Sequence, residues 1–241
     1  YFVKYGKANC IVKSKEGIVQ FVFSDKDQET IVDGRIGNFW AFEEQLKEKL
    51  QGIGFQQGYF RKNVACVAIP IHTSSNDVKN VFDSFDQLGF TEVYTIFEPV
   101  ALIHSLSRQS PDNLWRGIID VGSSKVDISL INKHEMIQQS TFNLSKNRME
   151  RWFKDQKMTE FLANIISEEA QMVFENMSHA DFQVILTGGG MRHPGLGHIL
   201  LRTFDALYPT ILVENHDDLI VDGMEAIWSH ESRKTWIRGR I

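Results

Sequence analysis

Residues 118–130 carry the side chains and the turn that could bind a nucleotide phosphate. Asp120 ends an apolar run, Gly122 follows two residues later, and Ser123 and Ser124 lead into a second apolar run. This order predicts a strand, a tight turn and a second strand, and the N–H groups of such a turn could face phosphate oxygens. The carboxylate of Asp120 could also hold a water of a magnesium ion, although this signal is weak. Because Asp-x-Gly is common in ordinary hairpins, the pattern alone leaves both interpretations open.

A second glycine-rich turn consists of Gly188, Gly189 and Gly190, directly after the apolar run 183–187. Three successive residues without a Cβ would let a purine or a ribose lie against bare backbone. A flexible loop is the alternative. The Pro-Gly pair at 194–195 follows this turn and favours a binding turn.

The composition excludes several classes of protein. The chain has 241 residues, 42% of them hydrophobic, which suits one large domain or two small ones. A net charge of −5 disfavours nucleic-acid binding over the whole surface, and we expect no sequence-specific contact with nucleic acid. No apolar run approaches the roughly 20 residues of a membrane-spanning helix, so no membrane association is expected. Cys10 and Cys66 lie in apolar runs without metal-ligand spacing, as is typical of reduced core residues in an intracellular protein.

The elements that must position these turns form two halves, each beginning with strand patterns and ending on helices. Alternating and continuous apolar runs predict strands within 1–23, at 64–70 and 92–97, as three strands within 117–142, and at 183–187. Apolar positions at helical spacing predict helices at 38–50, 74–89, 99–107, 149–153, 159–177 and 196–207. This duplicated plan predicts a mixed α/β protein of two domains with a nucleotide cleft between them.

Taken in order, four segments resemble the actin and heat-shock-70 superfamily over nearly the whole chain. Residues 5–9 resemble its first phosphate loop, and residues 120–122 resemble its second. Residues 95–102 resemble the helix that connects the two domains, and residues 186–196 resemble the turn that contacts adenosine. The resemblance implies an α/β, actin-like fold of two ribonuclease-H-like domains around a nucleotide cleft, with outer subdomains that are reduced or missing from this chain.

The resemblance also implies where the domains begin and end. Domain I would span 1–107, with the C-terminal helices within 222–241 packing back on it. Domain II would span 108–221. Each domain would then carry one of the two phosphate loops.

An ATP site is what the resemblance implies for these loops. The residues that it would place at the nucleotide are Lys4, Gly6, Lys7, Asp120, Gly122, Ser123, Ser124, Gly188, Gly189 and Gly190. Glu98 and Asp127 stand at positions that resemble those of water-positioning residues, which makes them the candidate catalytic residues. From the residues alone, Glu98 could instead cap the helix that follows it, and Asp127 could simply face solvent.

Lys4 departs from the family pattern, because the first phosphate loop normally begins with an Asp that holds waters of the nucleotide's Mg²⁺. A cation in this place would repel Mg²⁺ and could itself neutralise a phosphate. The alternative is a lysine that extends from a strand edge to solvent. Ser123, Ser124 and Lys125 also crowd the second turn. We therefore expect ATP to bind with little or no hydrolysis, and binding of Mg²⁺ beside it is doubtful. An empty cleft is the alternative.

Among actin-related proteins, the divergent subunits of SWI/SNF-type chromatin remodellers resemble the chain most, in the turn at 119–122 and the ending at 235–238. This resemblance implies a nuclear structural subunit that pairs with a second actin-like protein. It also implies a bound helix of the remodelling ATPase, which we expect near Trp228 and Trp236. The alternatives are a cytoplasmic filament-end subunit of a complex such as dynactin, and a bacterial rod-shape-type filament ATPase.

Overall fold

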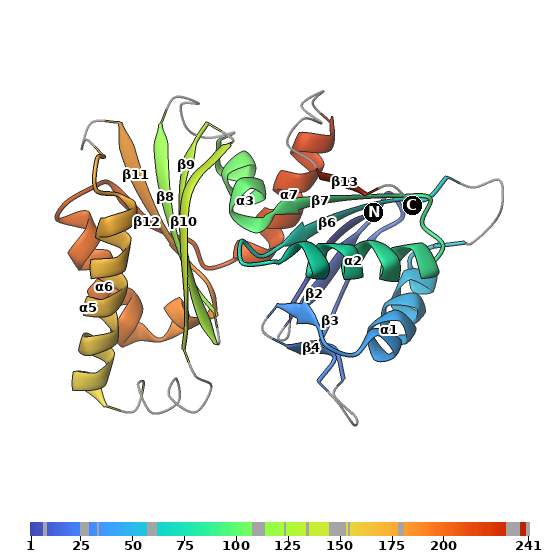
Figure 1. The fold of residues 1–241 in the computed structure, drawn as a ribbon, viewed down its shortest axis with the longest axis horizontal. Helices are drawn as coiled ribbons and strands as arrows, with labels where there is room; N and C mark the ends of the chain where they lie inside the picture. The colour runs from blue at the N-terminus through green and yellow to red at the C-terminus, as the bar shows by residue number, and fades with distance from the viewer. Residues whose placement is uncertain are drawn as a thin grey trace. The chain divides into compact units, whose positions relative to one another are not determined.

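The computed structural model describes most of the chain, which forms two compact units (Figure 1). The described residues are 1–6, 9–24, 29–32, 34–56, 62–107, 114–122, 124–133, 135–144, 153, 155–177, 181–229 and 237–239. One unit comprises 1–108 together with 217–241, and the other comprises 109–216. We predicted the second boundary at 221/222, but α7 (His216–Ser229) runs through that point as one helix, so the boundary lies at its start.

A six-stranded mixed sheet forms the centre of the first unit, in the order β13-β7-β6-β1-β2-β3. Its strands are β1 (Phe2–Tyr5), β2 (Cys10–Lys13), β3 (Ile18–Phe21), β6 (Val64–Ile69), β7 (Glu92–Phe97) and β13 (Ile237–Gly239). The first three form an antiparallel meander, whereas β1, β6 and β7 are parallel. A separate pair is formed by β4 (Ile31–Val32) and β5 (Arg35–Ile36). Because β1 and β7 run in the same direction, their carboxyl ends lie at the same edge of the sheet.

The helices described in the first unit are α1 (Phe39–Gly52), α2 (Ser75–Gln87), α3 (Glu98–Ser107) and α7. Polar side chains fix where two of them begin. Asn38 accepts a hydrogen bond from the N–H of Ala41 at the start of α1, and Ser74 and Asp77 form a reciprocal capping box at the start of α2. Such caps satisfy backbone N–H groups that have no partner inside the helix.

Aromatic side chains fill the core of the first unit. Phe42 of α1 is fully buried, and its ring centroid lies 5.2 Å from that of Phe23, 5.7 Å from Tyr5 and 6.2 Å from Phe85. Tyr5 therefore points to the face of the sheet that α1 covers. Since neighbouring residues of a strand point to opposite faces, Lys4 points to the other face.

The second unit repeats the plan with a five-stranded sheet in the order β10-β9-β8-β11-β12. Its strands are β8 (Trp115–Val121), β9 (Lys125–Asn132), β10 (Glu135–Asn143), β11 (Phe182–Thr187) and β12 (Thr210–Leu212). Again three strands form an antiparallel meander, and β8, β11 and β12 are parallel. The helices α5 (Gln156–Val173) and α6 (Pro194–Asp205) lie side by side, and a short 3₁₀ turn, η1 (Gly189–Arg192), precedes α6 (Figure 1). The predicted duplicated α/β plan is confirmed.

The ends of some elements differ from the prediction. The helix expected at 159–177 begins earlier, at Gln156, because the side chain of Asp155 caps it through the N–H of Lys157. It ends at Val173, and Met177 is outside it. The helix expected at 149–153 lies outside the described residues except for Phe153, which is part of a turn.

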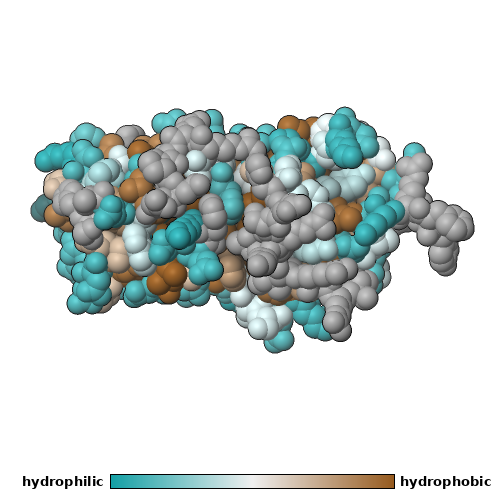
Figure 2. Space-filling model, turned by 90° about the horizontal axis from the view of Figure 1, so that it is seen from above, coloured by the Kyte–Doolittle hydropathy of each residue, from teal (hydrophilic) through white to brown (hydrophobic). Residues whose placement is uncertain are grey.

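The described surface is mostly hydrophilic on the face shown in Figure 2, where hydrophobic residues form small, separate areas. None of the helices in the described part of the chain is long and apolar enough to cross a membrane.

We expect Gly223→Ala to destabilise the first unit, because α7 crosses α3 at this glycine. A Cβ on Gly223 would overlap the carbonyl oxygen of Ala101 and lie 2.7 Å from its carbonyl carbon. Overpacking of this kind costs about 1–3 kcal/mol of unfolding free energy or more. Gly52→Ala in α1 is the matched control, since no atom lies within 4 Å of its added Cβ. Urea denaturation would measure the free energy of unfolding of both variants. Equal losses in the two variants would show that the contact between α3 and α7 is loosely packed.

Candidate functional site

A buried lysine in β1 is the centre of the charged groups in the first unit. Lys4 is 7% exposed, and its Nζ lies 2.7 Å from Oε1 of Glu98 and 3.8 Å from Oδ1 of Asp217. Nζ also donates a hydrogen bond to the carbonyl oxygen of Tyr5 at 3.4 Å. The interpretation in which Lys4 extends from a strand edge to solvent is therefore wrong.

Three elements of the first unit bring these charges together. Lys4 lies near the carboxyl end of β1, Glu98 begins α3 directly after β7, and Asp217 lies in the first turn of α7. The parallel arrangement of β1 and β7 brings Lys4 and Glu98 to one edge of the sheet. Carboxylates in the first turn of a helix are stabilised by the helix dipole. One ammonium group thus faces carboxylates at the N-termini of two helices.

The first predicted phosphate loop is anchored to the same cluster. Nδ2 of Asn9 donates to Oδ2 of Asp217 at 3.0 Å, and Nε2 of Gln20 donates to Oδ1 of Asn9 at 2.9 Å. A Cβ on Gly6 would lie 3.3 Å from the carbonyl oxygen of Asn9 and 3.7 Å from Nζ of Lys4, so the backbone at Gly6 passes close to the ammonium. Lys7, the third residue predicted in this loop, lies outside the described residues.

The neutral groups near Lys4 stay neutral over the physiological range of pH. Burial raises the pKa of the Tyr5 phenol, and the nearby charge of Glu98 raises it further. Burial also raises the pKa of the Cys10 thiol, although Lys4 acts in the opposite direction. Cys10 and Cys66 are both buried free thiols, as predicted. The charge of the cluster is therefore carried by Lys4, Glu98 and Asp217.

The second predicted phosphate loop is the tight turn between β8 and β9, so the predicted strand, turn and strand are confirmed. The N–H of Gly122 donates to the carbonyl oxygen of Lys125 at 2.9 Å, and the carbonyl oxygen of Ser124 accepts from the N–H of Leu144 at 2.6 Å. Ser123 lies outside the described residues. The N–H of Gly122 is thus used within the hairpin rather than turned towards a ligand.

Asp120 and Asp127 are direct partners on β8 and β9, in a row that continues to Thr141 on β10 and Thr187 on β11. Partners in register point to the same face of a sheet. The hydroxyl of Thr141 donates to Oδ1 of Asp127 at 2.6 Å. The described residues contain no group of three or more His, Cys, Asp or Glu side chains that could hold a metal ion, and this includes the surroundings of Asp120.

The glycine turn starts where this row ends, since Gly188 directly follows Thr187. Gly188 has a φ of 97°, and a Cβ there would overlap Oδ1 of Asp120 and lie 2.5 Å from the carbonyl oxygen of Val121. A Cβ on Gly190 would overlap Cγ1 of Val121. Gly189 differs, because no atom lies within 4 Å of its added Cβ. The outer two glycines are required by packing on β8, and the middle one leaves bare backbone beside open space.

A cavity of about 470 Å³ lies beside the glycine turn in the second unit. Its walls include Gly188, Met191, Arg192, His198, Leu212 and Asn215. The volume lies within the roughly 300–1,000 Å³ of small-molecule sites. Met191 and Leu212 supply apolar surface, and the planar guanidinium of Arg192 is of a type that stacks on aromatic rings. The chemistry of this cavity suits a purine nucleoside.

Sequence reasoning missed Asp217 as a site residue, and it included Asn9 and Arg192 only as members of the segments 5–9 and 186–196. Arg192 had a usable signal, since it lies two residues after the glycine turn. Asp217 had none, because it contacts Asn9 and Lys4 across 208 and 213 residues of chain. Only the folded sheet brings those positions together.

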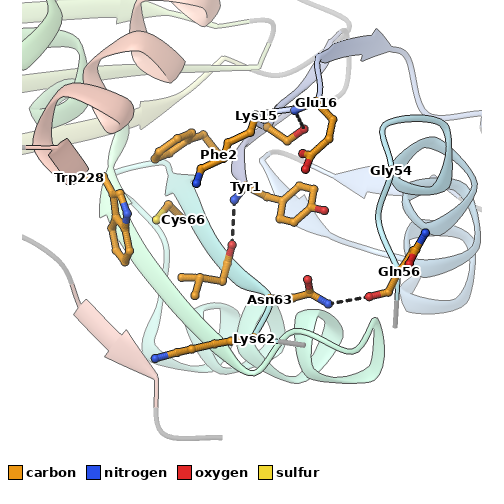
Figure 3. Close-up of a pocket in the computed structure, with 12 residues that line it drawn as sticks. Tyr1, Phe2, Lys15, Glu16, Gly54, Gln56, Lys62, Asn63, Cys66 and Trp228 are labelled. Atoms are coloured by element: carbon orange, nitrogen blue, oxygen red, sulfur yellow. Dashed lines mark hydrogen bonds between the residues drawn. The ribbon is translucent and has the colours of Figure 1, made fainter. Parts of the chain in front are cut away.

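A second cavity, of about 520 Å³, lies in the first unit (Figure 3). Tyr1 and Val64 line it, so it adjoins the amino-terminal ends of β1 and β6, away from the edge that carries Lys4. Trp228 forms part of its wall and also packs edge-on against Tyr94, with ring centroids 5.2 Å apart. This is the region where we expected a partner-binding groove. Its other predicted residue, Trp236, lies outside the described residues.

We expect Gly188→Ala to lower the free energy of unfolding by about 1–3 kcal/mol or more, because the new Cβ combines a positive φ with overlap on Asp120. Gly189→Ala is the matched control and should change it by less than about 1 kcal/mol. Chemical denaturation followed by circular dichroism would measure both. A Gly188→Ala variant as stable as wild type would contradict the packing account of the turn.

Comparison with known proteins places this arrangement in a known fold. No protein-family model and no curated protein matches the chain. Solved structures do match it. MreB5 of Spiroplasma citri bound to AMPPNP is 14% identical, with a TM-score of 0.73 over 97% of both chains. The MamK double helical filament is 12% identical, with a TM-score of 0.74 over 95% of this chain and 98% of that chain. A chain of the PilM–PilN type IV pilus biogenesis complex is 11% identical, with a TM-score of 0.64 over 94% and 97%. The chain therefore has the fold of these proteins, which is the actin-like fold that the sequence predicted.

Proposed function

We propose that the protein is a nucleotide-binding, actin-like assembly subunit of the bacterial filament type, in which hydrolysis of the nucleotide is weak or absent. The observation that carries this proposal is the glycine turn, where packing explains Gly188 and Gly190 but not the exposed Gly189, and where Gly188 and Arg192 line the 470 Å³ cavity. The solved structures support it, since MreB5 was solved with ADP and with AMPPNP, and MamK was solved as a double helical filament.

Each unit, taken by itself, has residues whose chemistry fits one part of a nucleotide. In the second unit, the bare backbone at Gly189 and the guanidinium of Arg192 suit a ribose and a purine. In the first unit, Lys4 beside the Gly6 turn suits a phosphate group, because lysine binds phosphate as a point charge. Bound ATP would supply a phosphoanhydride bond whose cleavage requires a water held in line with it.

Weak hydrolysis follows from the partner of Glu98. A residue that orients the attacking water must present its carboxylate to that water. Oε1 of Glu98 instead lies 2.7 Å from Nζ of Lys4, and the Glu98 side chain is only 9% exposed. Asp127, the other predicted candidate, accepts a hydrogen bond from Thr141. Both carboxylates therefore have structural roles already.

The role that we predicted first, a nuclear subunit of a chromatin remodeller, has no support from the comparisons. Solved structures that share the fold include MreB, MamK, PilM and EutJ, and none of those names concerns chromatin or dynactin. The bacterial filament alternative is better supported. We accordingly propose a second copy of this chain as the partner, in place of a second actin-like protein and a remodelling ATPase helix, and the cytoplasm as the location.

Nucleotide extraction and assembly assays test the proposal together. We expect adenine nucleotide to bind at about one per chain, as measured by calorimetry, and filaments or larger oligomers to appear by sedimentation and electron microscopy when nucleotide is added. Gly189→Val is the matched variant, because it fills the open space beside the turn and should weaken binding without overlapping β8. Absence of both binding and assembly would refute the proposal.

Phosphate release tests the weak-hydrolysis part separately. We expect the wild-type rate to stay within about threefold of the Glu98→Ala rate, because removing a catalytic base or water-orienting group would cost about 10²–10⁴-fold. Asp127→Ala tests the other predicted candidate in the same way, and its rate should also stay within about threefold of the wild-type rate. If Glu98→Ala instead lowers the rate of phosphate release by that larger factor, the wild-type protein is a working ATPase.

A further inference from the structure

The first phosphate loop has a cation where the fold family implies a magnesium ion. Nζ of Lys4 lies 2.7 Å from Oε1 of Glu98 and 3.8 Å from Oδ1 of Asp217, so the acidic groups of this site already face an ammonium. The cluster is enclosed, since the side chains of Lys4 and Glu98 are each 9% exposed and that of Asp217 is 19% exposed.

The residues present do not fit a divalent metal at this point. Magnesium requires near-octahedral oxygen ligands at about 2.0–2.1 Å. A metal at that distance from Oδ1 of Asp217 would lie within about 6 Å of Nζ of Lys4, and closer still if it bound Oε1 of Glu98. Two like charges at such distances in a poorly solvated site repel strongly. Lysine provides donors only, so it cannot contribute a ligand.

We propose that Lys4 is the fixed cation of the phosphate site and that the protein binds its nucleotide without a divalent metal. Lys4 contributes one positive charge at a fixed place beside the first loop. Glu98 and Asp217 offset this charge in the unliganded cluster, so a phosphate group would compete with these two carboxylates for the ammonium. The inference rests on the proposed nucleotide binding and specifies how its phosphates are neutralised.

Asp217 is the positioning residue that this role requires. Its Oδ1 faces Nζ of Lys4, while its Oδ2 accepts the hydrogen bond from Asn9 in the first loop. Glu98 holds the ammonium from α3 and Asp217 holds it from α7. The cation is therefore oriented by two helices before any ligand arrives, which limits the reorganisation that binding requires.

The test measures the affinity of the whole chain for ATP and ADP by calorimetry, once in excess Mg²⁺ and once in excess EDTA. We expect the wild-type dissociation constant to change by less than about threefold between the two conditions, and Lys4→Met to weaken binding about tenfold or more in both. Lys13→Met is the matched control, because Lys13 also pairs with two acids. Its Nζ lies 2.8 Å from Oδ1 of Asp222 and 2.8 Å from Oε2 of Glu225, and Lys13 ends β2 at the end of the strand away from the first loop. This variant should leave affinity unchanged.

A second variant reverses the metal dependence. Lys4→Asp should bind nucleotide weakly in EDTA and regain affinity in Mg²⁺, and Mg²⁺ should raise its melting temperature but not that of wild type. Wild-type binding that requires Mg²⁺ would overturn this inference and leave the proposed nucleotide binding intact. No wild-type binding in either condition would overturn the proposed function itself. The wild-type comparison decides the question even if both variants of Lys4 fail to fold.

Discussion

The burial of one ammonium group constrains much of the first unit. An unpaired charge in such a place is costly, so Lys4 depends on Glu98 and Asp217, and each of these carboxylates depends on Lys4. The three residues come from β1, α3 and α7, and α7 follows the second unit in the chain. The ion cluster therefore ties the last described helix to the first strand. Any ligand that reaches the first loop meets a cation that the protein itself has placed.

The glycine turn of the second unit obeys a different constraint, which is steric rather than electrostatic. Gly188 and Gly190 press against β8 so closely that no side chain fits, whatever the turn binds. Their presence alone is therefore weak evidence for a ligand. Gly189 is informative because packing gives no reason for it, and it directly follows Gly188, which lines the adjoining cavity. Within this turn, the case for a nucleotide depends on the glycine whose added Cβ would meet no atom.

Local patterns predicted the fold well, because the information lay within short stretches of chain. Continuous apolar runs identified β6 and β11, and the caps at Asn38 and Ser74 identified where α1 and α2 begin. The site was harder. The sequence showed that Lys4 was unusual, but whether it reached solvent or an acid depended on Asp217, 213 residues away. The start of α5 was misplaced because Asp155 caps it just ahead of its apolar stripe. Long-range pairing therefore decided the state of Lys4, whereas a local cap outside the apolar pattern decided the start of α5.

The positive charge of Lys4 is balanced by acids of the same unit, which explains how a shared fold can have a different charge at this position. Lys4 keeps its ladder partners, Ile11 on β2 and Ala68 on β6, so the reversed charge leaves β1 in register. Two acids at helix N-termini face this cation in the folded chain. The backbone matches MreB5 with a TM-score of 0.73 at 14% identity, so the shared fold leaves the side chains of the site free to differ. Likeness of fold therefore says little about metal use or hydrolysis here. Those properties follow from which group stands beside Glu98, and in this chain that group is an ammonium.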